Sequence, residues 1–188
     1  MQRSHWTLPF ACLAAVVCSG SQLEPFRELN AADDKPADIK LHIFSWEETQ
    51  KLIASKKGKI VVIDAWSTSC VPCIKEFPNL VALHKSQAAD VACVSLNLDY
   101  IGLKAKPPEF YRDRVTKFLT KHEATFDNVL CSEEIESVCE KLGVPSIPAV
   151  LVYDRAGKLV KTFDNSEAEN EDEGFTYKDV TEFIKTLK

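Results

Sequence analysis

Cys70 and Cys73 are the two residues of this sequence that are best placed to do chemistry together, because only Val71 and Pro72 separate them. Two cysteines at this spacing can close a small disulfide ring at the start of a helix, whose unpaired N–H groups favour a thiolate. We therefore predict a redox-active Cys70–Cys73 disulfide, with Cys70 as the low-pKa attacking sulfur and Cys73 as the resolving thiol. The same spacing is also half of a zinc site, so the pair alone is only suggestive.

The residues around the pair predict a strand that leads through a short turn into a helix. Residues 60–63 are four consecutive apolar residues, typical of a strand covered on both faces. Pro72 falls in the first turn of the helix, where its missing N–H has no helical partner. We expect the helix to run to about Gln87, with Pro78 kinking it.

Further residues around the pair carry a resemblance to a known family. Asp64 stands six residues before Cys70, Trp66 is the aromatic residue after that acid, and Glu76, Phe77 and Pro78 complete a C-x-x-E-F-P pattern. From Ile39 to Lys188 the chain resembles a thioredoxin-fold thiol–disulfide oxidoreductase of the extracytoplasmic TlpA/ResA type. The resemblance implies an α/β thioredoxin fold in which helices flank a central mixed β-sheet.

The resemblance also implies roles for three residues near the sulfurs. A buried Asp64 would have a pKa raised by desolvation and could accept the Cys73 proton, or it is a strand-end acid bonded to backbone. Glu76 follows Cys73 by three residues, so it lies on the same helix face and would tune the sulfurs, or it is an exposed helix glutamate. Trp66 is expected to pack beside the site and shield it.

Pro148 matches the family's cis-proline, which packs against the active-site cysteines just before a strand. Cis X–Pro bonds are uncommon, so this assignment rests on the resemblance. The alternative is that Pro145 and Pro148 are both trans turn residues. Two positions depart from the family pattern: Ser69 replaces a tryptophan common before the first cysteine, and Ser95 stands where thioredoxin has a lysine paired with the buried acid. The titration of Asp64 therefore cannot be taken from thioredoxin.

The function that these residues predict is thiol–disulfide exchange with protein substrates through a mixed disulfide at Cys70. The resemblance to ResA-like proteins in the C-x-x-E-F-P pattern implies a reductase that is recharged by an upstream electron-donor protein, without cofactor or metal. The alternatives are a thiol oxidase or isomerase of the same fold, a peroxiredoxin-like peroxidase with Ser67 three residues before Cys70, a copper chaperone, although that class normally carries C-x-x-x-C, and a non-catalytic interaction domain.

Composition agrees with one globular domain in a chain of 188 residues. A net charge of −5 and the lack of a basic cluster argue against nucleic-acid binding, and we expect a monomer. Cysteines at positions 93, 131 and 139 are predicted to be buried singletons. The last two are eight residues apart, largely within one predicted helix, where about 12 Å would separate their Cα atoms. That distance is too long for a disulfide, unless Cys131 lies off the helix and folds back.

The N-terminal residues 1–21 have the pattern of an export signal, with Arg3, an apolar core over residues 8–17 and small residues at 19–21. The core is too short to span a membrane. We expect an extracytoplasmic protein, periplasmic or secreted. Alternatives are a lipoprotein attached to the membrane through Cys18 and an N-terminus that is uncleaved or is no signal at all. Cys12 also falls in this segment, residues 22–38 read as a linker, and the thioredoxin-like domain spans 39–188.

The rest of the domain shows alternating strand and helix patterns. Ser45 and Glu48 form a predicted capping box. Acidic residues dominate the stretch 164–174, which reads as a solvated loop. Strands are predicted over 39–43, 91–98, 126–130, 150–153 and 158–163, and helices over 46–56, 109–122, 132–142 and 176–187.

Overall fold

A computed structural model of the chain describes residues 38–166, 168 and 174–187. The predicted leader 1–21, including Cys12 and Cys18, lies outside the described residues. So does the predicted linker 22–38, except for Asp38, and part of the predicted acidic loop 164–174. Within the part of the chain that is described, no helix combines the length and apolar content that crossing a bilayer requires.

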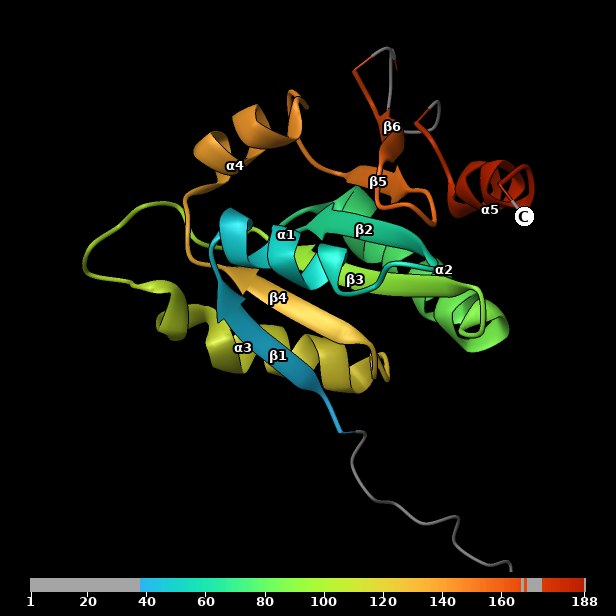
Figure 1. The fold of residues 1–188 in the computed structure, drawn as a ribbon. Helices are drawn as coiled ribbons and strands as arrows, with labels where there is room; N and C mark the ends of the chain where they lie inside the picture. Colours follow the sequence, from blue (N-terminus) through green and yellow to red (C-terminus); the bar gives the residue numbers. More distant parts are fainter. Residues whose placement is uncertain (1–37, 167, 169–173, 188) are drawn as a thin grey trace, which may run out of the picture. The chain divides into compact units, whose positions relative to one another are not determined.

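Six strands form one mixed sheet in the order β1-β4-β3-β2-β5-β6 (Figure 1). The first four strands of that order are parallel neighbours, and the β2–β5 and β5–β6 pairs are antiparallel. This arrangement confirms the predicted α/β fold with a mixed sheet flanked by helices. The strands are β1 (Lys40–Phe44), β2 (Ile60–Trp66), β3 (Val91–Asn97), β4 (Asp127–Cys131), β5 (Ala149–Tyr153) and β6 (Leu159–Asp164), and the helices are α1 (Trp46–Ala54), α2 (Val71–Gln87), α3 (Pro108–Lys121), α4 (Ile135–Leu142) and α5 (Tyr177–Lys185).

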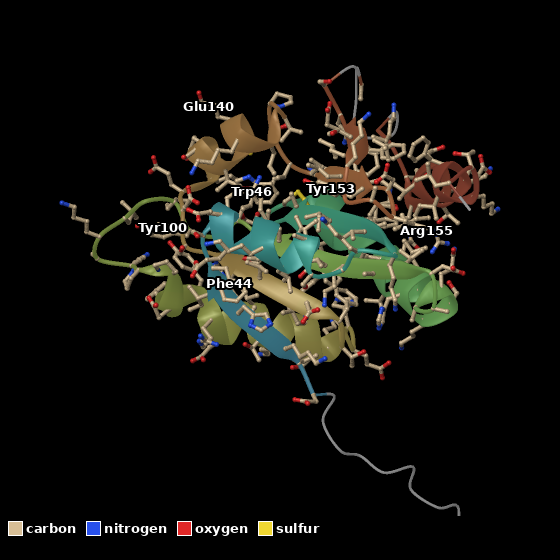
Figure 2. The ribbon with its side chains drawn as sticks, viewed as in Figure 1. Phe44, Trp46, Tyr100, Glu140, Tyr153 and Arg155 are labelled. Carbon is tan, nitrogen blue, oxygen red and sulfur yellow. A yellow bond between two sulfur atoms is a disulfide. The ribbon has the colours of Figure 1, made fainter. Side chains whose placement is uncertain are left out.

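Strand β2 lies inside the sheet and is buried along its whole length. Its side chains alternate between the two faces, as in any strand. Ile60, Val62 and Trp66 pack in a cluster with residues of α2, α3 and α5. Val61 and Ile63 pack in a second cluster with residues of α1 and α4, including Trp46 (Figures 1 and 2). By this alternation Asp64 faces the side covered by α2 and α5.

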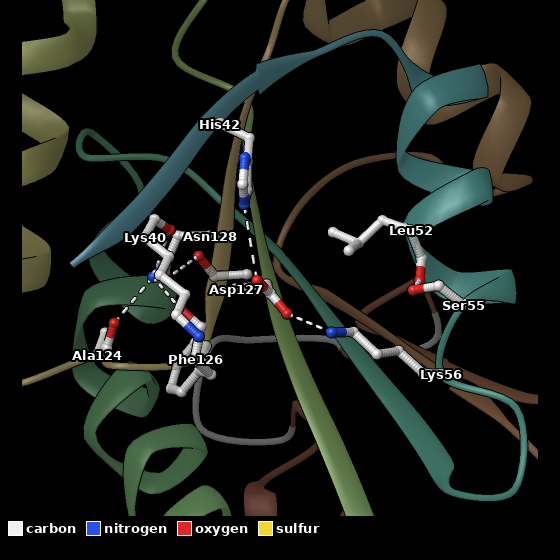
Figure 3. Close-up of polar contacts among 10 residues, drawn as sticks. Lys40, His42, Leu52, Ser55, Lys56, Ala124, Phe126, Asp127 and Asn128 are labelled. Atoms are coloured by element: carbon white, nitrogen blue, oxygen red, sulfur yellow. Dashed lines mark hydrogen bonds and ion pairs between the residues drawn. The ribbon is translucent and has the colours of Figure 1, made fainter. Parts of the chain in front are cut away.

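Strand β4 is fixed to its neighbours by two polar side chains at its start (Figure 3). Asp127 pairs with Lys56 at 2.5 Å and with His42 at 3.6 Å, which joins β4 to β1 and to the end of α1. The buried amide of Asn128 donates to three backbone carbonyls, on Lys40, Ala124 and Phe126. These contacts define the register of β1 against β4.

The start of α4 differs from the prediction. The helix begins at Ile135 rather than at Ser132, because Ser132 still donates its backbone N–H to Phe44 at 2.8 Å, continuing the β1–β4 pairing. Cys131 therefore ends a strand. Glu133, predicted in the first turn of this helix, instead accepts a hydrogen bond from the Trp46 backbone N–H at 2.7 Å and pairs with Lys141. The predicted capping box of Ser45 and Glu48 is present at the start of α1.

Candidate active site

Cys70 and Cys73 form a disulfide at the start of α2. Cys70 is the N-cap residue, and its Sγ accepts a hydrogen bond from the Cys73 backbone N–H at 3.3 Å. Pro72 lies in the first helical turn, as expected. Cys73 is only 2% exposed, whereas Cys70 is partly exposed beside the exposed side chain of Val71. Of the two sulfurs, Cys70 is therefore the one that an external thiol or disulfide can approach.

The turn that delivers Cys70 is held by a buried carboxylate, Asp99. Asp99 accepts hydrogen bonds from the backbone N–H and the hydroxyl of Thr68, each at 2.7 Å. Arg114 on α3 donates to the same carboxylate from Nη2 at 2.7 Å and from Nε at 3.1 Å. The Asp99 side chain is fully buried and that of Arg114 is half exposed. Two hydrogen bonds from Thr68 to Asp99, whose carboxylate is itself paired with Arg114, thus fix the turn against the end of β3 and α3.

Asp99 was not identified as a functional residue from the sequence, where it follows the strand predicted over 91–98. One signal was available: the acid directly follows a buried parallel strand, at the sheet edge where the active-site turn also lies. The two serines of this turn, Ser67 and Ser69, have their hydroxyl oxygens 3.1 Å apart. Ser69 thus takes the place of the family's tryptophan with a small polar side chain.

Asp64 lies buried on β2 behind the disulfide, with 5% of its surface exposed. Burial raises the pKa of its carboxyl to about 7, and the negative charge of Glu76 adds to this effect. The phenol of Tyr177 opposes the shift by donating a hydrogen bond to Asp64 Oδ2 at 2.6 Å. Asp64 is therefore bonded by a side chain, and its proton can be gained or lost near neutral pH.

Glu76 lies on the same face of α2 as Cys73 and is half-buried. Its Oε2 accepts a hydrogen bond from the backbone N–H of Tyr177 at 3.2 Å and one from Asn79 Nδ2 at 3.1 Å. The carboxylate thus lies at the N-terminus of α5, where the helix dipole favours negative charge. Glu76 is not the freely exposed helix glutamate of the alternative interpretation.

A cavity of about 90 Å³ brings five of the predicted site residues together. This volume is large enough to admit water. Its lining contains Asp64, Pro72, Cys73, Glu76 and Pro148, along with Lys75, Val150, Asn165 and residues 174–177. The resolving sulfur, both acids and the proline before β5 therefore face one small space.

The Ile147–Pro148 peptide bond is cis, as the resemblance led us to expect. Pro148 lines the cavity beside Cys73, and Pro145 does not. Trp66 lies elsewhere: it is fully buried and packs against Phe77 and Phe118, with ring centroids 4.8 and 4.6 Å apart. Its ring supports the helix that carries Cys73 from the core and does not line the cavity.

Ser95 and Tyr177 together explain how Asp64 lies buried without the lysine of thioredoxin. Ser95 is the register neighbour of Asp64 on β3, but its hydroxyl donates to Asn128 Oδ1 on β4 at 2.7 Å. The phenol of Tyr177, from the start of α5, bonds Asp64 instead. Tyr177 was not predicted as a site residue, because 113 residues separate it from Asp64 and no local pattern indicates the contact.

The other described cysteines are free and buried, as predicted: Cys93, Cys131 and Cys139. Burial raises the pKa of all three thiols, that of Cys131 to about 11. Across the described part of the chain, no three His, Cys, Asp or Glu side chains gather as metal ligands would.

The chain is similar to known proteins in sequence and in fold. The profile of the Redoxin family matches residues 31–179. The chain is 23% identical to the thiol-disulfide oxidoreductase ResA of Halalkalibacterium halodurans, over 86% of this chain and 80% of that protein. It is 26% identical to the thioredoxin-like protein YneN of Bacillus subtilis, over 65% of each. A DsbF homologue from Corynebacterium diphtheriae superposes with a TM-score of 0.55 at 21% identity, over 72% of this chain and 76% of that one. These matches confirm the resemblance stated from the sequence.

Proposed function

The chain belongs to the Redoxin family, and from this premise we propose that it is an exported thiol–disulfide oxidoreductase that reduces disulfides in other proteins. One observation carries the proposal: a disulfide at a helix start has one approachable sulfur, Cys70, and one buried sulfur, Cys73, beside a buried acid. This arrangement separates the thiol that meets the substrate from the thiol that completes the exchange.

The reaction would proceed by two successive thiolate attacks. In the reduced protein, the Cys70 thiolate attacks one sulfur of a substrate disulfide and expels the other sulfur as a thiolate, which leaves Cys70 in a mixed disulfide. Cys73 then gives its proton to the Asp64 carboxylate and attacks Cys70 Sγ. The substrate leaves as a second thiolate, and the Cys70–Cys73 disulfide closes.

The geometry gives each supporting residue a role in this scheme. The N-terminus of α2 stabilises the Cys70 thiolate through its N–H groups. Asp64 has a pKa of about 7, so near neutral pH it can accept a proton and later release it to the cavity. Pro148 walls the cavity beside Cys73. Two electrons from an upstream donor protein would return the disulfide to the dithiol.

The reducing direction rests on sequence similarity. The C-x-x-E-F-P pattern around Cys70 and Cys73 is the one shared with ResA-like proteins, and relatives matched by this chain carry the name thiol-disulfide oxidoreductase ResA. Export is proposed from the signal-like residues 1–21, with Cys18 as the candidate for lipid attachment if the leader is processed as a lipoprotein.

The test is the reduction potential of the Cys70–Cys73 couple, measured by equilibrating the protein in glutathione or dithiothreitol buffers. We expect a value near or below that of thioredoxin, about −270 mV. A value near −120 mV, typical of DsbA, would contradict the reducing direction and favour a thiol oxidase.

A Cys73→Ser variant provides the control for this measurement. It retains Cys70 and the three buried cysteines but cannot close the disulfide, so it should show no reversible two-electron couple. It should also trap a mixed disulfide with a substrate protein. If the parent protein showed no reversible couple either, with both thiols intact, the proposed activity itself would fail.

A further inference from the structure

Tyr177 contacts both acids of the candidate site from a helix that carries neither of them. Its phenol donates to Asp64 Oδ2 at 2.6 Å, and its backbone N–H donates to Glu76 Oε2 at 3.2 Å. The side chain is 4% exposed and lines the same cavity as Cys73. One residue at the start of α5 thus connects β2, α2 and the cavity next to the resolving sulfur.

The position of Tyr177 is itself determined by the fold around it. Thr176 and Asp179 form a capping box that sets where α5 begins. Val180 and Ile184, one and two turns further, are fully buried against the sheet. The Tyr177 ring is therefore fixed by α5 as a whole, and its hydroxyl donates a hydrogen bond to Asp64.

We propose that Tyr177 is a positioning residue for the exchange reaction, whose phenol holds the Asp64 carboxylate as the proton acceptor for Cys73. This inference rests on the proposed function, because it concerns the second step of the same exchange. Among the described residues, the phenol is the hydrogen-bond donor that Asp64 has in place of a cation. A hydrogen bond to a charged group stabilises the charged form, so the phenol keeps Asp64 available as a base.

The surroundings of Asp64 shift its pKa in opposite directions. Burial and the charge of Glu76 raise the pKa of Asp64, and the Tyr177 hydrogen bond lowers it. Cys93 interacts electrostatically with both Asp64 and Tyr177 from β3, and burial raises the pKa of its thiol. Among the residues that the structure describes, the titratable or charged groups around Asp64 are Cys73, Lys75 and Glu76 on α2, Cys93 on β3 and Tyr177 on α5.

The chemical step keeps its balance in this scheme. The Cys73 thiol loses its proton to the Asp64 carboxylate, and the resulting thiolate forms the bond to Cys70 Sγ as the bond from Cys70 to the substrate sulfur breaks. Tyr177 neither gains nor loses a proton, since burial and the neighbouring Asp64 raise its pKa well above the ordinary value. Its contribution is to the charge state and the position of Asp64.

The test is a Tyr177→Phe variant of the full chain, with oxidised glutathione as the probe. The second step is measured as release of glutathione from the mixed disulfide between pH 5 and 9. Attack by Cys70 is measured separately in a Cys73→Ser background. We expect the second step to slow by on the order of tenfold at pH 7, and its pH midpoint to move up by about one to two pH units. Attack by Cys70 should be unchanged.

Tyr153→Phe is the matched control, because Tyr153 is a half-buried tyrosine on β5 that packs in the cluster beneath α1 and α4 (Figure 2). It should leave both steps and the pH midpoint as in the parent protein. If Tyr177→Phe left the midpoint unchanged while the parent protein exchanged normally, the inference would be wrong. If the parent itself did not exchange, the proposed function would fail instead.

A second measurement tests the inference if the Tyr177→Phe variant does not fold. Replacing all four tyrosines of the chain by 3-fluorotyrosine keeps every ring and makes each phenol a stronger hydrogen-bond donor. The pH midpoint of the second step should then move down, because the stronger donor favours the ionised carboxylate. An unchanged or raised midpoint would overturn the role of Tyr177.

Discussion

Two buried aspartates lie near the disulfide, and the structure surrounds them in opposite ways. Asp99 accepts four hydrogen bonds, two of them from the guanidinium of Arg114, so its charge has a counterion. Asp64 is equally shielded from solvent but accepts one hydrogen bond, from the neutral phenol of Tyr177, and faces the negative charge of Glu76. Similar burial therefore gives one carboxylate a structural environment and the other a reactive one.

The difference shows that the hydrogen-bond and charge partners of a buried aspartate, rather than its depth of burial, decide whether it has a structural role or can accept a proton. A buried carboxylate is costly unless it is paired and hydrogen-bonded. Asp99 has such partners, and it fixes the turn that carries Cys70. Asp64 pairs with no cation among the described residues, so burial moves its pKa to about 7, close to the pH at which exchange would take place. The matched substitution of each aspartate by asparagine tests this contrast.

The largest expected effect is on the pH dependence of stability in Asp64→Asn. The folded-state pKa of about 7 lies above the ordinary value of 3.8, so the folded protein binds a proton that the unfolded chain releases between these values. Ionising the buried carboxyl lowers the free energy of unfolding. This loss of stability is absent below about pH 4, grows as the pH rises through this window, and reaches its full size above about pH 7. Asp64→Asn removes it, so the variant should gain roughly 4 kcal/mol relative to the parent between pH 4 and 8.

Urea denaturation of the oxidised proteins at several pH values measures this gain. The control is Asp99→Asn, which should show no gain at any pH, because the residue that it replaces is already paired with Arg114. A parallel stability curve for Asp64→Asn and the parent across the window would mean that Asp64 does not carry a raised pKa.

The next effect is on the rate of exchange by Asp64→Asn. An amide cannot accept the Cys73 proton, and general-base assistance is commonly worth about 10²-fold or more. We expect release of the product from the mixed disulfide to slow on the order of 10²-fold at pH 7, with attack by Cys70 unaffected. Stopped-flow kinetics with oxidised glutathione separates the two steps, and an equal slowing of both would point to a general disturbance of the site.

A smaller effect is expected on stability from Asp99→Asn. The amide cannot pair with Arg114, and it places an N–H2 group among the donors of Thr68 and Arg114. Leaving such buried groups poorly satisfied costs about 1–3 kcal/mol. Denaturation at pH 7 measures the loss. Glu47→Ala, which breaks an exposed pair with Lys51 on α1, is the control and should have little effect, because exposed pairs of this kind contribute little.

The sequence predicted those parts of the molecule that depend on local pattern. The strand, turn and helix around Cys70, the capping box at Ser45 and the buried single cysteines all follow from periodicity, cap residues and apolar runs. The cis bond before Pro148 could be anticipated only through resemblance, since the residues around it allow either isomer.

What the sequence could not predict depends on contacts between distant segments. Tyr177 meets Asp64 across 113 residues, and Asp99 meets Thr68 across 31. The predicted start of α4 was wrong for the same reason. Pairing between β1 and β4 continues past Cys131, and it overrides the local helical pattern from Ser132 onward. In each case the tertiary partner determines the outcome, and its position is not encoded nearby in the chain.

The smallest expected effect is that of Glu76→Gln, and its direction is opposite to that of Tyr177→Phe. Glu76 is half-buried, and its negative charge raises the pKa of Asp64. This effect is smaller than those of burial and of the Tyr177 hydrogen bond. Neutralising it should lower the pH midpoint of the second exchange step. The amide can still accept the hydrogen bond from the Tyr177 backbone, so the start of α5 is kept in place.

Charge interactions at partly exposed positions are worth about 1 kcal/mol or less, so the rate at pH 7 should change by at most about fivefold. The midpoint is measured with the same glutathione-release assay. If Glu76→Gln and Tyr177→Phe moved it in the same direction, the two groups would not be acting on Asp64 through its charge, and the contrast with Asp99 would need another explanation.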